Sequence, residues 1–196
     1  IDRRDVGLIE YRYCECARKC GLEVAETRLF PSARCEGYFG TKRFDRIKRP
    51  DGTIRRVHML SVSALLETSH RIPNLDYRTL MTLELTKDYS EVEKMYRLMC
   101  FNVYAHNRDD HSKNFTFLYD EDRQAWKLSP AYDLTYSNSL GGEHATSVNG
   151  NGRDPSRKDI LAIAEHIGIA KTKAKQIANQ VEAAVADVLG NVSQYR

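Results

Sequence analysis

The residues with the strongest potential for chemistry lie in a polar run from 106 to 114 and in a second loop that follows it. Asp109 and Asn114 stand five residues apart in the run, and Asp133 ends the second loop, which reads Pro-Ala-Tyr-Asp from residue 130. A carboxylate can accept a proton, and carboxylate and amide oxygens are good ligands for a hard cation. Because polar loops on rigid scaffolds commonly carry catalytic groups, these two loops are the first candidate for an active site.

Phosphoryl transfer is the chemistry that this set of groups suits best. One carboxylate must orient the attacking hydroxyl and take its proton, and oxygen ligands must hold the Mg2+ that bridges the phosphates. Asp109 has the first role in this interpretation, and Asn114 and Asp133 have the second. Each motif alone occurs often by chance, and many polar loops are only solvated. Their succession along the chain favours a phosphotransferase.

The elements around the two loops are predicted from hydrophobic periodicity. Residues 91–106 predict a helix that is apolar on nearly all faces and therefore buried centrally. A hairpin over 115–119 and 125–128, with its turn at 120–122, connects the two loops. The remaining predictions are strands over 22–30 and 37–44 and helices over 5–20, over 61–68, over 77–86, from a Ser156/Asp159 cap to Gly168, and up to Gly190.

A basic stretch lies between residues 42 and 58. It contains seven Lys or Arg residues against Asp45 and Asp51, and Pro50-Asp51-Gly52 in its middle is a strong turn signal. A solvated hairpin is the simplest interpretation, because runs of charge usually face water. The alternative is a surface for phosphates or for an acidic partner.

Composition places the chain among ordinary globular proteins. Of its 196 residues 41% are hydrophobic and 29% are charged, and no apolar run approaches the roughly 18 residues that a membrane span needs. The net charge of +3 does not by itself indicate nucleic-acid binding. The number of cysteines is odd, and the cluster of Cys14, Cys16 and Cys20 does not have zinc-site spacing. The simpler interpretation is the apolar stripe of one helix, formed by Val6, Ile9, Tyr13, Cys16 and Cys20. We therefore expect a reduced, cytoplasmic protein without a membrane partner.

The two polar loops closely resemble the C-terminal kinase lobe of HipA-like toxins, the bacterial serine/threonine kinases of type II toxin–antitoxin systems. The resemblance rests on Arg108–Phe115 and Leu128–Asp133, with further matches at 8–25, 43–46 and 147–150. It implies an α+β, protein-kinase-like fold with a mostly helical large lobe and a partial small lobe of one helix and a few strands. Residues 1–45 would form the remainder of the small lobe and the hinge, and 46–196 the large lobe with the catalytic and metal-binding loops.

The resemblance also implies roles for individual residues, with ATP and Mg2+ as cofactors. Asp109 would be the catalytic base, assisted by Lys113 as a cation for the transferring phosphoryl group. Asn114 and Asp133 would hold Mg2+, and Glu10 would offer a carboxylate to the ATP-binding lysine. The nucleotide would contact the hinge, chiefly through its backbone, and the two loops: Lys42, Arg43, Phe44, His111, Lys113, Asn114, Tyr132 and Asp133.

By the same resemblance the protein would be an ATP-dependent Ser/Thr protein kinase that acts as a toxin. It would transfer the γ-phosphoryl group of ATP to a protein hydroxyl, for example on a translation factor such as an aminoacyl-tRNA synthetase. An antitoxin of the HipB type would bind it. Nucleic acid would be met only indirectly, through that antitoxin.

The chain departs from the family pattern in two ways. The family's Gly-rich phosphate loop and its strand lysine precede the first helix, and no G-x-G-x-x-G motif precedes residue 10 here. We therefore expect the chain to be part of a longer protein, and by itself to bind ATP poorly and transfer slowly. The second departure is Asp110, which stands where the family is expected to have a small residue such as Gly. We expect its carboxylate to face water.

Two other functions remain open at the level of the sequence. A catalytically impaired, kinase-like scaffold would bind an antitoxin or another partner, and the missing phosphate loop motivates this alternative. A small-molecule phosphotransferase of the antibiotic- or choline-kinase type also places Asp and Asn in such a loop. The signatures at 43–46 and 130–133 argue against this second alternative.

Overall fold

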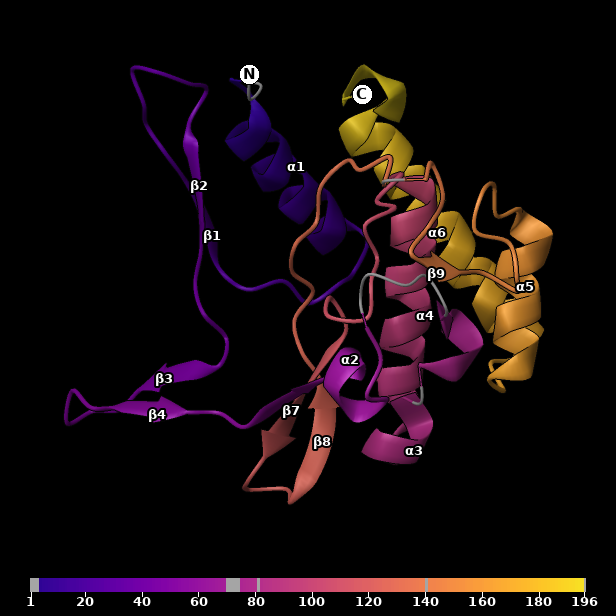
Figure 1. The fold of residues 1–196 in the computed structure, drawn as a ribbon, viewed down its shortest axis with the longest axis horizontal. Coiled ribbons are helices and arrows are strands. Elements are labelled where there is room, and N and C mark those ends of the chain that lie inside the picture. Colours follow the sequence, from indigo (N-terminus) through magenta and orange to yellow (C-terminus); the bar gives the residue numbers. More distant parts are fainter. Residues whose placement is uncertain (1–3, 70–74, 81, 140, 196) are drawn as a thin grey trace.

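The computed structural model describes residues 4–69, 75–80, 82–139 and 141–195. Helix α4 (Tyr89–Tyr104) lies at its centre and packs against the long helix α6 (Lys171–Leu189) (Figure 1). α6 also packs against α1 (Val6–Lys19) and α5 (Arg157–His166). Nine of the 16 residues of α4 are buried, which confirms the central helix that the periodicity predicted.

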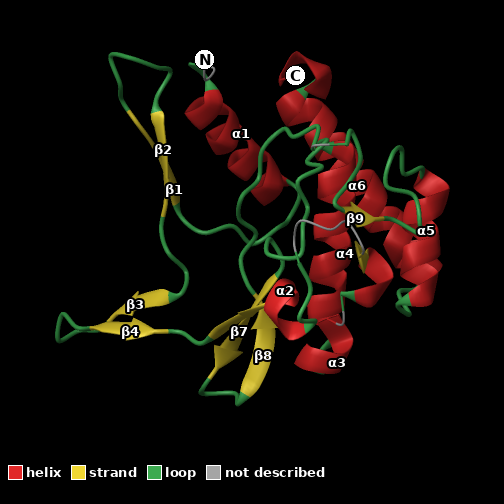
Figure 2. Cartoon of the chain, in the orientation of Figure 1, coloured by secondary structure: helices red, strands yellow, loops and turns green. Residues whose placement is uncertain are grey.

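Small sheets lie beside and below this helical body (Figure 2). One of these sheets has three strands, and its middle strand begins at Thr116, two residues after Asn114. The antiparallel pairs are β1 (Thr27–Phe30) with β2 (Tyr38–Thr41), β3 (Arg46–Lys48) with β4 (Ile54–Arg56), and β7 (Thr116–Asp120) with both β5 (Met59–Ser61) and β8 (Ala125–Leu128), while β6 (Leu75–Asp76) and β9 (Thr146–Ser147) pair in parallel.

Two predicted helices are shorter than their patterns indicated. The helix expected over 61–68 is only α2 (Val62–Leu65), because Ser63 bonds the backbone of Thr68 through both its hydroxyl and its carbonyl and closes a turn. The segment expected to be helical over 77–86 contains a 3-10 turn, η1 (Tyr77–Thr79), and the short helix α3 (Thr82–Thr86). The chain ends in a second 3-10 turn, η2 (Val192–Tyr195).

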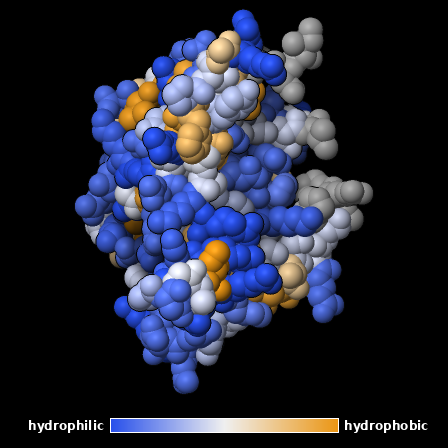
Figure 3. All heavy atoms as spheres, turned by 90° about the vertical axis from the view of Figure 1, so that its left-hand side faces the viewer, coloured by the Kyte–Doolittle hydropathy of each residue, from blue (hydrophilic) through white to orange (hydrophobic). Residues whose placement is uncertain are grey.

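The predicted strands are also shorter. In the 22–30 segment the strand begins only at Thr27, since Val24 instead forms an isolated bridge to Ala131, and in the 37–44 segment it ends at Thr41. The basic stretch forms the expected hairpin, β3–β4, which projects from the body (Figure 1). The face that carries the β1–β2 and β3–β4 hairpins is mostly hydrophilic with scattered apolar side chains (Figure 3).

Helix α1 is held against the β1–β2 hairpin by a close backbone contact at Gly7. A Cβ atom at this position would lie 2.4 Å from the Gly37 carbonyl oxygen, so only glycine fits without a shift of the helix. Burial of Ile9, Tyr13, Cys16 and the C-cap residue Cys20 confirms most of the predicted apolar stripe, whereas Val6 at the start of α1 is 46% exposed. Among the described residues, no helix combines the length and apolar character needed to cross a membrane.

Candidate active site

The candidate catalytic loop begins where α4 ends. Ala105 caps the helix, and His106 then adopts a left-handed backbone conformation with a φ of 56°. The Asn107 amide donates to the Asn102 carbonyl at 2.9 Å, which fixes the direction in which the chain leaves the helix. The His106 ring stacks on Tyr136, with ring centroids 4.9 Å apart. The loop is thus attached at its start to the most central helix of the molecule.

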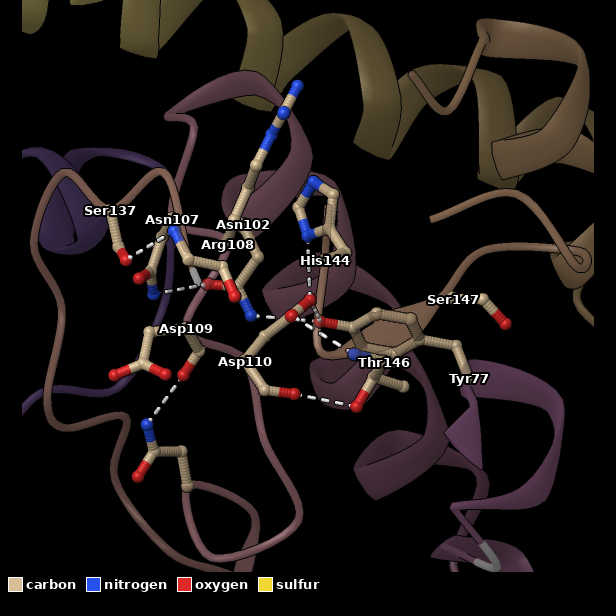
Figure 4. A network of polar contacts seen from close by, with 12 residues as sticks. Tyr77, Asn102, Asn107, Arg108, Asp109, Asp110, Ser137, His144, Thr146 and Ser147 are labelled. Atoms are coloured by element: carbon tan, nitrogen blue, oxygen red, sulfur yellow. Dashed lines mark hydrogen bonds and ion pairs between the residues drawn. The ribbon is translucent and has the colours of Figure 1, made fainter. Parts of the chain in front are cut away.

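Asp109 and Asn114 are brought together by a hydrogen bond. Nδ2 of Asn114 donates to the backbone carbonyl of Asp109 at 2.9 Å, and the Asn114 amide donates to the His111 carbonyl at 2.8 Å. The Asp109 side chain is exposed, and no donor within the described residues contacts its carboxylate (Figure 4). Such a carboxylate can accept a proton from an incoming group. The side-chain amide of Asn114 uses its NH2 group in the loop, so its oxygen remains suitable as a ligand.

The loop that carries Asp133 is positioned by main-chain hydrogen bonds on either side. Before it, the buried carboxylate of Glu91 on α4 accepts from the Leu128 amide at 2.7 Å. Within it, the Ala131 amide donates to the Glu23 carbonyl at 2.8 Å and ties the loop to the segment after α1. Asp133 itself is exposed and has a positive φ of 57°.

Tyr132 connects the two loops to each other and to the predicted hinge. Its hydroxyl lies 2.6 Å from Oγ1 of Thr116 and also donates to the Lys113 carbonyl. Its ring centroid lies 5.5 Å from that of Phe44. Burial raises the pKa of the Tyr132 hydroxyl, which therefore acts as a neutral donor. The proposed nucleotide-contacting residues Phe44, Lys113 and Tyr132 are thus neighbours in space.

The side chains of Lys42 and Arg43 have other partners. Arg43 donates two hydrogen bonds to the buried carboxylate of Asp45, at 2.8 and 2.7 Å, and Lys42 pairs with Glu26 at 3.4 Å. Both basic side chains therefore have carboxylate partners in the described structure, and the hinge role of 42–44 stays a prediction. The side chain of Lys113 is exposed.

Glu10 on α1 interacts electrostatically with the Asp133 loop. Burial raises the pKa of its carboxyl group, and the negative charge of Asp133 raises it further. α1 therefore presents a carboxylate toward the candidate metal ligand. The sequence predicted that Glu10 would serve a lysine, and that role stays a prediction.

Asn114 and Asp133 offer a donor set that fits Mg2+. This ion prefers oxygen ligands and usually takes only one or two carboxylates from a protein, because waters and phosphate oxygens complete its octahedron. Within the described residues no group of three or more His, Cys, Asp or Glu side chains forms a metal site. Amide and carboxylate oxygens on two tethered loops would hold Mg2+ jointly with nucleotide phosphates.

Asp110 does not face water, and that expectation was wrong. The residue is 1% exposed, and its carboxylate accepts hydrogen bonds from the Tyr77 hydroxyl at 2.8 Å and from the Thr146 amide at 3.2 Å. Nδ1 of His144 also lies 2.8 Å from it. Asp109 and Asp110 are therefore neighbours in sequence with opposite environments, one exposed and one enclosed.

A wide cleft lies beside Asp109, on the side of the loop formed by residues 136–152. Its volume is about 1290 Å3, and Asp109 and His111 are part of its wall. The opposite parts of the wall include Asp76, Arg78, Tyr136, Glu143 and His144. Asn114 and Asp133 are not among the lining residues. The candidate base is thus placed where a large acceptor group could approach it.

Sequence reasoning missed the groups that support the site from a distance. Glu91, Tyr77, His144 and Thr146 all bond to the two loops or to Asp110, and all four are buried. The sequence offered no local signal for them, because α4 also contains Glu93, Lys94 and Arg97 and nothing in its pattern marks Glu91 as the buried charge.

Comparisons with known proteins agree with this architecture. The family model described as HipA-like C-terminal domain matches residues 2–189. Two proteins of Sinorhizobium fredii (strain NBRC 101917 / NGR234) are similar in sequence: "Putative kinase Y4mE" is 31% identical over 60% of this chain, and "Putative kinase Y4dM" is 28% identical over 64%. The matches cover 29% and 32% of those two proteins, so the chain spans about a third of their length.

Two solved structures share the fold. HipA of the toxin–antitoxin system of Shewanella oneidensis MR-1, solved with HipB and operator DNA, superposes with a TM-score of 0.78 at 17% identity, over 97% of this chain and 50% of its own. The Helicobacter pylori proinflammatory kinase CtkA superposes with a TM-score of 0.58 at 11% identity, over 97% of this chain and 86% of its own. Because the family model covers nearly all of it, the chain belongs to the HipA-like C-terminal domain family and has an α+β, kinase-like fold.

Proposed function

We propose that the protein containing this chain is a HipA-like Ser/Thr protein kinase that uses ATP and Mg2+. The observation that carries the proposal is the hydrogen bond that joins Asn114 to Asp109, which lies in the wall of a wide cleft. The Asp133 loop is tethered to the same segment through Tyr132 and Lys113. This arrangement supports Asp109 as the proton acceptor and Asn114 and Asp133 as the metal ligands.

The roles in the proposed reaction follow from these positions. Asp109 accepts the proton of the attacking hydroxyl, which enters from the cleft. Bound ATP with Mg2+ supplies the phosphoryl group and the neutralising charge. Residues 1–45 act as the remaining small lobe with the hinge, and 46–196 as the large lobe. Metal or nucleotide contacts are made by Lys42, Arg43, Phe44, His111, Lys113, Asn114, Tyr132 and Asp133.

The proposal includes a protein substrate and an antitoxin. A cleft of about 1290 Å3 is large enough for a segment of polypeptide, which favours a protein hydroxyl over a small metabolite. The complex of the Shewanella HipA with HipB and operator DNA supports a HipB-type partner. The protein then meets nucleic acid only through that partner, acts as a toxin in the cytoplasm and targets a translation factor.

The test measures phosphate transfer and Mg-dependent ATP binding by the full-length protein and its Asp109→Asn variant. Loss of the base should lower transfer by at least about 100-fold while leaving ATP binding within about twofold. Asp122→Asn, in the exposed turn of the β7–β8 hairpin, is the matched control and should be fully active. Unchanged transfer by Asp109→Asn would contradict the proposal.

The same measurements separate the alternatives. A scaffold would bind its antitoxin without Mg-dependent ATP binding or transfer. A small-molecule phosphotransferase would label an aminoglycoside or choline and no protein. Either result would replace the kinase proposal.

A further inference from the structure

At the buried carboxylate of Asp110 three chain segments meet: its own loop, η1 and the segment 144–146 (Figure 4). Oδ2 accepts from the Tyr77 hydroxyl of η1 and lies 2.8 Å from Nδ1 of His144, while Oδ1 accepts from the Thr146 amide at 3.2 Å. The backbone carbonyl of Asp110 accepts from Oγ1 of Thr146 at 2.6 Å. Both ends of this residue are therefore fixed to the 144–146 segment.

A chain of side-chain hydrogen bonds closes around the residue that precedes Asp110. Nδ2 of Asn102 donates to the Tyr77 hydroxyl at 3.0 Å, and Nδ2 of Asn107 donates to Oδ1 of Asn102 at 3.0 Å. Asn107 and Asp110 stand on either side of Asp109 and its neighbour Arg108. The ring that runs Asn107, Asn102, Tyr77, Asp110 thus holds the loop on both sides of the candidate base.

The backbone between these two anchors is fixed as well. The Arg108 amide donates to the Ser137 carbonyl at 3.1 Å, and the Arg108 carbonyl accepts from the Ala145 amide at 3.1 Å. Asp109 is exposed while Asp110 is enclosed, and Figure 4 shows their carboxylates pointing away from each other. Because the backbone at Arg108 and the side chain of Asp110 are both fixed, the direction of the Asp109 side chain between them is set too.

We propose that Asp110 is a positioning residue that fixes the direction of the Asp109 carboxylate toward the cleft. His144 assists Asp110 in this role, because its ring bonds the Asp110 carboxylate and also lines the cleft. This inference rests on the proposed function. A buried carboxylate is costly unless it is hydrogen-bonded, so loss of any of its three donors should destabilise the enclosed position of Asp110.

Replacement of Asp110 by Asn tests the proposal in the full-length protein. One of the two carboxylate oxygens becomes an NH2 group, which must then face the Thr146 amide or the Tyr77 and His144 donors. We expect kcat to fall by about tenfold or more while the KM for ATP stays within about twofold, because a misdirected base loses transition-state contacts only. Tyr77→Phe removes a single donor and should lower kcat less.

A pair of variants at His144 separates positioning from packing. Nδ2 of an Asn at this position can replace Nδ1 as a donor, whereas Leu fills the space without one. His144→Asn should keep kcat within about threefold of the parent, and His144→Leu should lose as much as Asp110→Asn. If both His144 variants have the same kcat, or if kcat and the KM for ATP of Asp110→Asn change together, the role is only structural and the proposal is wrong.

Hydrogen exchange supplies a readout that does not depend on activity. Amides of residues 105–115 should exchange faster in Asp110→Asn than in the parent, while those of α6 exchange equally in both. Unchanged exchange in 105–115 overturns the anchoring role, whether or not the protein transfers phosphate. If the parent protein and Asp109→Asn are equally inactive, the proposed function fails, and the exchange result still decides the role of Asp110.

Discussion

Tyr132 contacts three parts of the candidate site. The Tyr132 side chain bonds Thr116 and the Lys113 carbonyl, while its ring faces Phe44. Thr116 begins the middle strand of the sheet and Lys113 precedes the candidate ligand Asn114. The Tyr132 hydroxyl is therefore one of the contacts that set the relative position of the two polar loops.

Tyr132→Phe removes that atom and keeps the ring contact. Because the Lys113 carbonyl then loses a donor, we expect the free energy of unfolding to fall by about 1–2 kcal/mol. Urea unfolding measures this change, and Mg2+ titration of nucleotide binding should show weaker metal affinity. Tyr38→Phe is the matched control, since Tyr38 is 55% exposed and should change neither quantity. Equal stability of Tyr132→Phe and the parent would contradict this account.

At the residue scale, the sequence could indicate only contacts between residues that are close along the chain. The Asp109 to Asn114 spacing is local, and these residues are joined by a direct bond. Asp110 was misplaced because its partners Tyr77 and His144 lie 33 and 34 residues away. No local pattern distinguishes an enclosed carboxylate from an exposed one when its donors come from distant segments.

Helix α5 is an element whose start depends on one reciprocal pair of hydrogen bonds. The Ser156 hydroxyl and the Asp159 amide form a capping box, in which the Asp159 carboxylate also accepts from the Ser156 amide at 2.8 Å. The Ser156 hydroxyl also donates to this carboxylate at 2.7 Å, and this bond, followed by the one from the Ser156 amide, lowers the pKa of Asp159. The folded protein therefore binds this proton less tightly than the unfolded chain does.

The stabilisation by Asp159 should consequently depend on pH. It is complete above the unfolded pKa of about 4 and is lost as the pH falls through the lower folded pKa. Asp159→Asn should be less stable than the parent by about 0.5–1 kcal/mol at pH 7, and the difference should shrink at pH 3. Urea unfolding at both pH values checks this, with Asp154→Asn as the control. A difference that grows on acidification would contradict it.

The contact between α1 and the β1–β2 hairpin depends on a missing side chain. Gly7→Ala would place a Cβ atom 2.4 Å from the Gly37 carbonyl and 3.0 Å from the Phe39 amide nitrogen. We expect a net loss of about 1–3 kcal/mol, because this backbone clash outweighs the better helix propensity of Ala. Gly141→Ala is the control, since its Cβ meets no described atom within 4 Å. Thermal unfolding of both variants and the parent measures the loss. A Gly7→Ala variant that is more stable than the parent would contradict the close contact.

At the element scale, long periodic segments were predictable and short ones were not. The central helix and the hairpin that follows it carry their signal in their own residues. The strands β5, β6 and β9 contain two or three residues each and exist only because a distant strand pairs with them. Their formation is a property of the assembled fold, so a local pattern could not reveal it.

The whole molecule consists of a well-packed helical body and a projecting basic arm, the β3–β4 hairpin (Figure 1). The arm exposes Ile47 and Ile54, which are 42% and 64% accessible, and is joined to the β7–β8 turn by an ion pair between Arg55 and Glu121 at 2.8 Å. Two short strands have little stability in isolation. The arm is therefore the part of the described structure in which the chain should open first.

Limited proteolysis tests this difference between arm and body. Trypsin should cut first after Lys48, at the exposed end of β3, and leave α4, α5 and α6 intact, while the Arg49–Pro50 bond resists this protease. Mass spectrometry of the earliest fragments identifies the site. Arg97 provides the internal comparison, because it lies within α4 and bonds the Cys20 carbonyl at 2.8 Å. A first cut at Arg97 would contradict the expected order of local stability.

Helix α4 supports both polar loops from its two ends. Glu91 near its start holds the Leu128 amide, and Asn102 near its end bonds Asn107. Because both attachments belong to the same helix, its thermal displacements carry Asp109 and Asp133 in the same direction. The separation between the candidate base Asp109 and the candidate metal ligand Asp133 should consequently change little when this helix moves.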